Sequence, residues 1–186
     1  MNSKRKDRRV QMSKSFLKDA LISLLKEQHI SQITVIELCQ LADVNRSTFY
    51  AHYSDIYELL NEIENDIMEQ LTKFLHSYVE NGEDPLTMTE KLIEFIGKNH
   101  QACEVLLSPN SNISFEKKIR RVAHQFLLVD QKDVLMTDER LFEYVSAFII
   151  SGSIEVVKTW LKNGRNRTPR DIAHLITELS QDGILF

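Results

Sequence analysis

The residues best suited to chemistry lie between Thr34 and Tyr53, where a cluster of polar side chains follows a short apolar helix pattern. Thr34 precedes the apolar run, and Glu37 lies three residues after Thr34. This spacing is the form of a capping box at the start of a helix. Asp43 and Val44 then make a turn, and Asn45 can cap a second short helix. The pattern predicts a helix-turn-helix, a unit that reads duplex DNA.

The second short helix is too polar to be ordinary core, and its apolar residues Val44, Phe49 and Tyr53 are expected to anchor it. Because arginine can pair bidentately with guanine, Arg46 is the best candidate for base specificity; the alternative is a solvated charge or a backbone contact. His52 can likewise cap a helix end instead of holding a phosphate. The predicted DNA-binding residues are Thr34, Asn45, Arg46, Ser47, Thr48, Tyr50, His52 and Tyr53.

At these residues the sequence resembles the DNA-binding domain of the tetracycline-repressor (TetR/AcrR) family of transcriptional regulators. Ser13–Gln28 is similar to that family's first helix, Thr34 to its phosphate-contacting threonine, and Ser47–Tyr53 to its recognition-helix pattern. The family usually has a lysine at the start of helix 4, where this chain has Tyr57 and Glu58. The resemblance implies a homodimer on a palindromic double-stranded operator, with repression released by a small-molecule effector.

The rest of the chain predicts an all-α protein with two domains. Residues 1–54 form the helix-turn-helix domain with a basic amino-terminal arm, and 55–186 form a helical regulatory and dimerisation domain. A long linking helix over 55–79 enters this second domain, because its apolar spacing runs without Gly or Pro. Further helices are predicted over 86–100, 101–107, 112–129 and 137–163, and a last one is capped by Thr168 with Pro169 in its first turn.

Charge is divided unevenly along the chain. Residues 1–53 carry a net charge of +4 and the remainder carries −8, so a basic head precedes an acidic body. This division orients the head toward a phosphate surface. The basic run within residues 4–9 is predicted to be a flexible arm that reaches phosphates or the minor groove; the alternative is a solvated tail.

The helix over 137–163 has apolar residues on two faces, which one core does not easily cover. We therefore expect the last two helices to form a four-helix interface between two copies, as the family resemblance also implies; the alternative is burial within one subunit. The predicted interface residues are Tyr144, Ala147, Ser151, Ile154, Leu161, Ile172, Leu175, Ile176 and Leu179.

The family resemblance also implies an effector site between the linking helix and its neighbours. Aromatic residues at helical spacing are also typical of core, so a packing role is the alternative for each candidate. The candidate lining residues are Phe74, Tyr78, Phe95, Cys103, Phe126 and Trp160.

Catalytic, metal and cofactor motifs are not predicted. The six histidines have no metal-ligand spacing, and there is no Gly-rich phosphate loop or nucleophile motif. Cys39 and Cys103 are expected to be small core residues, with redox sensing as the alternative. Without a secretory signal or membrane span, the chain is expected in the cytoplasm. An enzyme assembled from distant residues and a helical adaptor or coregulator acting through a protein partner are the alternatives to a DNA-binding regulator.

Overall fold

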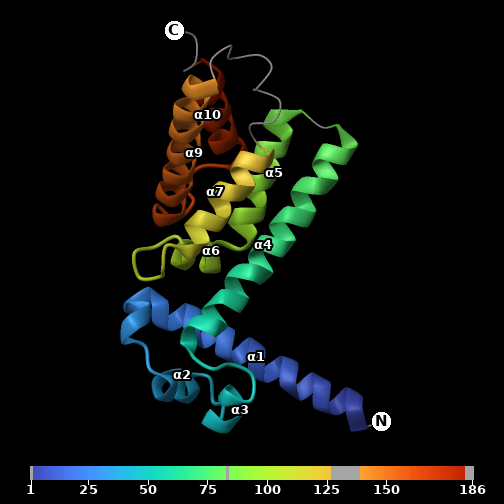
Figure 1. The fold of residues 1–186 in the computed structure, drawn as a ribbon, viewed down its shortest axis with the longest axis vertical. Helices are drawn as coiled ribbons and strands as arrows, with labels where there is room; N and C mark the ends of the chain where they lie inside the picture. Colours follow the sequence, from blue (N-terminus) through green and yellow to red (C-terminus); the bar gives the residue numbers. More distant parts are fainter. Residues whose placement is uncertain (1, 83, 127–138, 183–186) are drawn as a thin grey trace. The chain divides into compact units, whose positions relative to one another are not determined.

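A computed structural model describes residues 2–82, 84–126 and 139–182, and every regular element within these ranges is helical (Figure 1). The predicted all-α class is confirmed. The elements are α1 (Asn2–Glu27), the short 3-10 helix η1 (Ile30–Gln32), α2 (Val35–Leu41), α3 (Arg46–Tyr50), α4 (Ile56–Asn81), α5 (Pro85–Lys98), α6 (His100–Leu106), α7 (Ser114–Phe126), α9 (Glu139–Lys162) and α10 (Pro169–Asp182).

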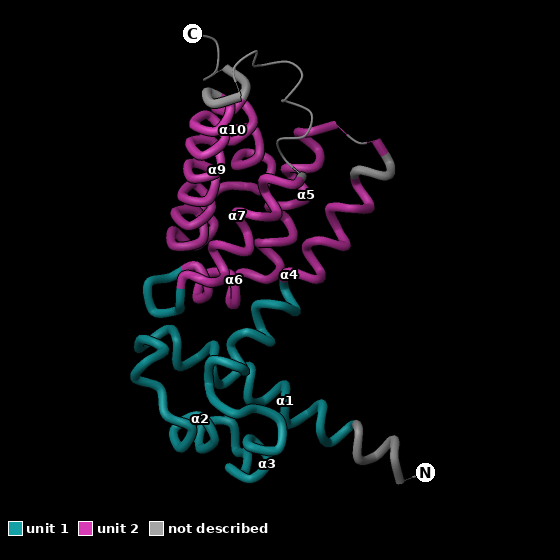
Figure 2. The backbone as a smooth tube through the Cα atoms, viewed as in Figure 1, with its two compact units in different colours: residues 1–67, 108–112 teal, residues 68–107, 113–186 magenta. Residues whose placement is uncertain are grey.

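The helices group into two compact units (Figure 2). Unit 1 comprises residues 1–67 and 108–112, and unit 2 comprises residues 68–107 and 113–186. Unit 1 therefore extends past residue 54, where the sequence placed a boundary, because it includes the first half of α4. It also includes a short loop, 108–112, that follows α6 in the chain.

The core of unit 1 comes from one face of α1 and the helices that pack on it. Leu17, Leu21 and Leu25 of α1 are fully buried, at the helical spacing that the sequence predicts. The prediction of a flexible arm before Ser13 is wrong in conformation, since α1 is helical from Asn2. Lysine and arginine are good helix formers, and this segment has no Gly or Pro to interrupt the helix.

Unit 2 packs α10 against α5 and α9, and α9 against α6 and α7. Phe115 and Trp160 are among its buried aromatic residues. α10 begins with the predicted cap: the Asp171 backbone N–H donates to Thr168 Oγ1 at 3.2 Å, and the Thr168 N–H donates to Asp171 Oδ2 at 3.1 Å. The last two helices therefore have a defined junction at residues 163–168.

Candidate nucleic-acid interface

We call residues 34–50 the reader. Its first helix, α2, starts where the sequence predicts. Thr34 is exposed with extended backbone, and its Oγ1 accepts a hydrogen bond from the Glu37 N–H at 3.2 Å. The Glu37 carboxylate accepts from Gln28 Nε2 at 2.7 Å, which ties α2 to the end of α1. The cap leaves the Thr34 side chain at the surface, where it can meet a phosphate.

The turn between α2 and α3 is made by Asp43 and Val44. Asp43 has a φ of 51°, a left-handed conformation that aspartate tolerates better than most residues. The Val44 N–H donates to the Cys39 carbonyl at 3.0 Å. Asn45 then caps α3 through its Oδ1, which accepts from the Ser47 N–H at 3.2 Å. Asn45 therefore has a structural role as the cap of the second reader helix.

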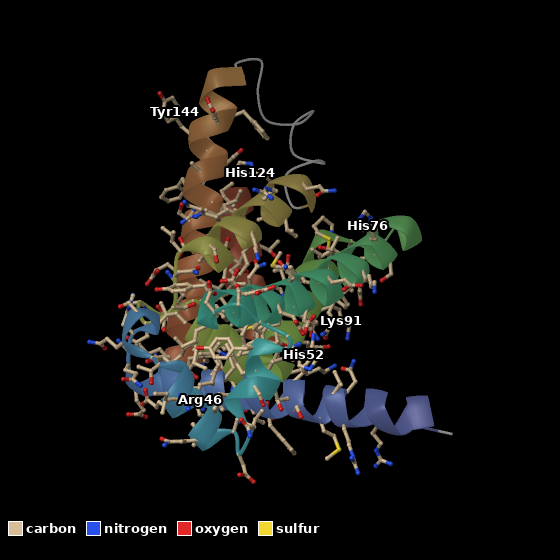
Figure 3. The ribbon with its side chains drawn as sticks, turned by 60° about the horizontal axis from the view of Figure 1, so that its bottom comes forward. Arg46, His52, His76, Lys91, His124 and Tyr144 are labelled. Atoms are coloured by element: carbon tan, nitrogen blue, oxygen red, sulfur yellow. The ribbon has the colours of Figure 1, made fainter. Side chains whose placement is uncertain are left out.

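Phe49 fixes which side of α3 faces outward. Phe49 is fully buried, and its ring packs edge-on to Tyr50 with 5.3 Å between centroids. Tyr50 itself is 59% exposed. Arg46 and Ser47 are exposed, whereas Thr48 and His52 are half-buried; Figure 3 labels Arg46 and His52. A five-residue helix thus presents an arginine, hydroxyl groups and a tyrosine on one accessible side.

Tyr53 is not available to DNA, which corrects its place among the predicted contacts. It is 2% exposed and packs against Phe49 with 5.6 Å between ring centroids, while Lys14 Nζ lies 5.2 Å from its ring centroid. Burial, and then the nearby Glu62 carboxylate, raise the pKa of the Tyr53 phenol well above its usual range. Tyr53 therefore anchors the reader, a role that the sequence also predicted for it.

An ion-pair network joins the first half of α4 to α1 within unit 1. Glu62 pairs with Lys14 at 3.0 Å and with Lys18 at 2.7 Å, and Lys18 also pairs with Asp66. Burial opposes the charged form of Glu62, but its hydrogen bonds from Lys18 and Lys14 outweigh this and lower its pKa. Burial likewise opposes a charged Lys18, yet Asp66 and Glu62 raise its pKa. The network favours one seating of α4 on α1.

The start of α4 carries carboxylates where the resemblance would place a lysine. Glu58 accepts from the Ser54 N–H at 2.6 Å and from Ser54 Oγ at 2.8 Å. Asp55 Oδ1 accepts from the Glu58 N–H at 2.8 Å. The two Ser54 hydrogen bonds, the backbone one first, lower the pKa of Glu58. These bonds cap α4, and Tyr57 beside them is 48% exposed.

Sequence reasoning missed Asn110, which belongs to unit 1 although it lies far from the reader in sequence. Its backbone carbonyl accepts from the Ile30 N–H at 2.8 Å, and its Nδ2 donates to the Leu25 carbonyl at 3.0 Å. A long-range hydrogen bond to a backbone group leaves no pattern in one sequence, so no signal could have found it.

Among the predicted effector residues, three aromatic rings of unit 2 lie together and two other side chains are buried. The rings of Phe74, Tyr78 and Phe95 lie together, with centroids 4.8 Å apart for Phe74 and Tyr78 and 6.1 Å for Phe74 and Phe95. Cys103 is buried, and burial raises the pKa of its thiol to about 12. Trp160 is buried and donates its Nε1–H to the Arg167 carbonyl at 2.9 Å. The side chain of Phe126 lies outside the described residues.

The predicted dimer residues differ in their exposure. Three of them are turned into unit 2, since Ile154 and Ile172 are 7% exposed and Leu161 is 4% exposed. They fill the subunit's own core, which corrects their assignment. Ile176 is half-buried, and the remaining residues are exposed: Tyr144, Ala147, Ser151, Leu175 and Leu179.

Phe148, which the sequence did not place in the interface, is 75% exposed, as is Tyr144 one helical turn before it. Gly152 and Glu155 continue this exposed face along α9 at a spacing of three to four residues. Apolar residues on two faces of this helix were visible in the sequence, but the sequence did not show which of them the subunit buries. Ile154 and Leu161 are buried, whereas Tyr144 and Ala147, predicted for the same interface, are exposed.

Metal sites and membrane-crossing helices are both absent from the residues that the structure describes. Among them, no group of three or more His, Cys, Asp or Glu side chains is arranged to hold a metal ion. No helix in the same ranges combines the length and apolar character needed to cross a membrane.

The arrangement in unit 1 is that of a helix-turn-helix protein, and comparison with known families specifies it further. Residues 83–182, more than half of the chain, match the TetR_C_8 family, described as a transcriptional regulator C-terminal region. The chain belongs to the TetR family of transcriptional regulators.

Individual relatives agree with this placement. The HTH-type transcriptional regulator YxbF of Bacillus subtilis (strain 168) is 23% identical over 171 residues, which cover 88% of this chain and 43% of that protein. This chain therefore spans less than half the length of that relative. A TetR transcriptional regulator from Streptococcus agalactiae 2603V is 26% identical with a TM-score of 0.73, covering 96% of this chain and 98% of that chain.

A third relative shares the fold at lower identity. FadR of Thermus thermophilus, a TetR-family transcriptional repressor solved in complex with lauroyl-CoA, is 15% identical with a TM-score of 0.60. The match covers 93% of this chain and 95% of that chain.

Proposed function

We propose that the protein is a sequence-specific DNA-binding transcriptional regulator that represses by occupying a palindromic operator. The observation that carries the proposal is the reader itself: Phe49 is fully buried while Arg46, Ser47 and Tyr50 beside it are exposed. A helix anchored on one side and polar on the other fits the major groove, where base edges present distinct donor and acceptor patterns. Arg46, Ser47 and Thr48 are proposed to approach bases, and Thr34, Tyr50 and His52 to hold phosphates.

The protein is proposed to act as a homodimer, because α3, which is five residues long, contacts too few base pairs to specify a site alone. The exposed face of α9 and α10, led by Tyr144, Phe148 and Leu179, supports pairing through a four-helix interface. Two readers related by a two-fold axis recognise half-sites about 34 Å apart, one helical turn of DNA.

A small molecule is proposed to bind unit 2 and to favour one of two arrangements of the readers. The cluster of Phe74, Tyr78 and Phe95 supports an apolar ligand, and a relative of the same fold binds lauroyl-CoA. Trp160 is the only tryptophan in the chain, so its fluorescence reports on unit 2. A thermal-shift screen followed by operator titration tests this point; a ligand that stabilises the protein but leaves operator affinity unchanged argues against the coupling.

We propose that the protein acts in the cytoplasm, without catalysis or a bound cofactor. The test of the function is selection from a pool of random-sequence duplexes, together with mobility shifts on the DNA that flanks the gene. A regulator yields a two-fold symmetric consensus whose affinity falls steeply as salt rises, since phosphate contacts release counterions. Dimers that select no sequence would contradict the proposal and favour the adaptor that acts through a protein partner.

A further inference from the structure

The joint between α1 and α2, residues 28–34, connects the end of α1 to the reader. α1 ends at Glu27, and its last hydrogen bond in the helical pattern is donated by the Gln28 N–H to the Leu24 carbonyl at 3.0 Å. At His29 the backbone is extended, with φ −68° and ψ 145°. The next carbonyl, that of Leu25, therefore needs a hydrogen-bond donor other than the N–H four residues ahead.

Asn110 supplies that partner from the loop 108–112. Its Nδ2 donates to the Leu25 carbonyl at 3.0 Å, and its own carbonyl accepts from the Ile30 N–H at 2.8 Å. Leu25 is fully buried and Ile30 is 2% exposed, so water has little access to these side chains. Backbone groups in such surroundings are costly to leave without a partner.

The loop is braced so that Asn110 keeps its position. The Asn110 N–H donates to Ser108 Oγ at 3.2 Å, and the Ser111 N–H donates to the Ser108 carbonyl at 3.3 Å. Ser111 is 5% exposed. Figure 2 colours this loop with unit 1, although α6 before it and α7 after it belong to unit 2.

On the other side of the joint, the Gln28 side chain reaches α2 through its 2.7 Å bond to Glu37. The α1 end, the joint and α2 are thus linked by hydrogen bonds that begin at Asn110. We propose that Asn110 is a positioning residue for the reader: it fixes the α1–α2 joint and so the direction of α2 and α3.

The inference rests on the proposed function, and its test therefore has one readout that needs no DNA. The variants are Asn110→Ala and Asn110→Asp, in the full-length protein. The second keeps the side-chain size but, as a carboxylate, removes the donor to the Leu25 carbonyl. Asn166→Ala, at an exposed asparagine in the loop between α9 and α10, is the matched control.

Backbone amide hydrogen exchange is measured first. We expect residues 28–34 to exchange at least about tenfold faster in both Asn110 variants, with exchange in α9 and α10 unchanged and the control like wild type. Exchange that rises equally throughout the chain would assign Asn110 to general stability. Unchanged exchange at residues 28–34 would overturn the proposal that Asn110 fixes the joint.

Operator affinity is measured next on the duplex that the wild type selects, well below the unfolding temperature. We expect about tenfold weaker binding for both variants, and an effect of Gln28→Ala that is not additive with Asn110→Ala, because both act on one joint. A loosened joint with unchanged affinity would refute the positioning role. If the wild type selects no duplex, the proposed function fails, and the exchange result still shows whether Asn110 holds the joint.

Discussion

Replacing Arg46 by alanine separates base reading from folding. Arg46 is exposed at the first position of α3, where a positive charge gains nothing from the helix dipole. Its removal therefore leaves the free energy of unfolding within about 0.5 kcal/mol of the wild type. A stability role would predict a larger loss.

The expected loss in DNA binding is much larger. One bidentate arginine–guanine pair discriminates by about 1–3 kcal/mol, which is about 5- to 140-fold in affinity. A dimer on a symmetric operator contains two such pairs, so Arg46→Ala costs about 2–6 kcal/mol on the full site. On an operator with one half-site already changed at that base pair, the further cost falls to about half.

Fluorescence anisotropy titrations measure this on the selected duplex and on its single-base-pair variants. Arg46→Ala is expected to relax preference at one base pair in each half-site. Tyr50→Phe, which removes only a hydroxyl, is expected to weaken all sequences similarly. Arg170→Ala, an exposed arginine on α10, is the control and changes neither. If Arg46→Ala binds with wild-type affinity and selectivity, the assignment of base reading to this residue is refuted.

Three further perturbations probe the surroundings of the reader. Phe49→Ala empties a fully buried site and is expected to lower the free energy of unfolding by about 3–5 kcal/mol in urea titrations; a loss below about 1 kcal/mol would contradict its anchoring role. Glu62 has a lowered pKa, so its ion pairs with Lys14 and Lys18 stabilise the fold above pH 4.5 and are lost as pH falls through the folded-state value. Glu62→Gln should therefore cost up to about 1 kcal/mol at pH 7, a gap that closes in acid, and a gap constant across pH would count against the network. Phe148→Asp should shift sedimentation toward the monomer without lowering helical content, and an undiminished dimer would move the interface elsewhere.

Most of the helices could be predicted from local sequence signals, namely helix caps and apolar periodicity. Thr34, Asn45 and Thr168 each cap the helix that the sequence assigned to them, because capping depends only on residues within one turn. Apolar periodicity located the long helix α4 and the described ends of the helices after it to within a few residues, since a helix needs one continuous stripe to pack. The ends predicted at residues 129 and 137 lie outside the described residues. These features need no knowledge of the tertiary structure.

The errors arise where tertiary contacts decide. Ile154 and Leu161 of α9 were predicted to form the dimer interface, but the subunit itself covers them. Phe148, which was not predicted for that interface, is exposed. Periodicity predicts that a helix has two apolar faces but not which neighbour covers each. Asn110 is the extreme case, because its partners lie more than 75 residues away in sequence.

The central claim is that α3 lies in the major groove at two symmetric half-sites. Dimethyl sulfate methylates guanine N7, which faces that groove, so protection from methylation on the selected duplex tests the claim directly. We expect protected guanines in two sets about one helical turn apart, and loss of protection at one guanine per half-site in Arg46→Ala. Bound protein that leaves every guanine N7 reactive, or that protects a single unrepeated set, would contradict the account.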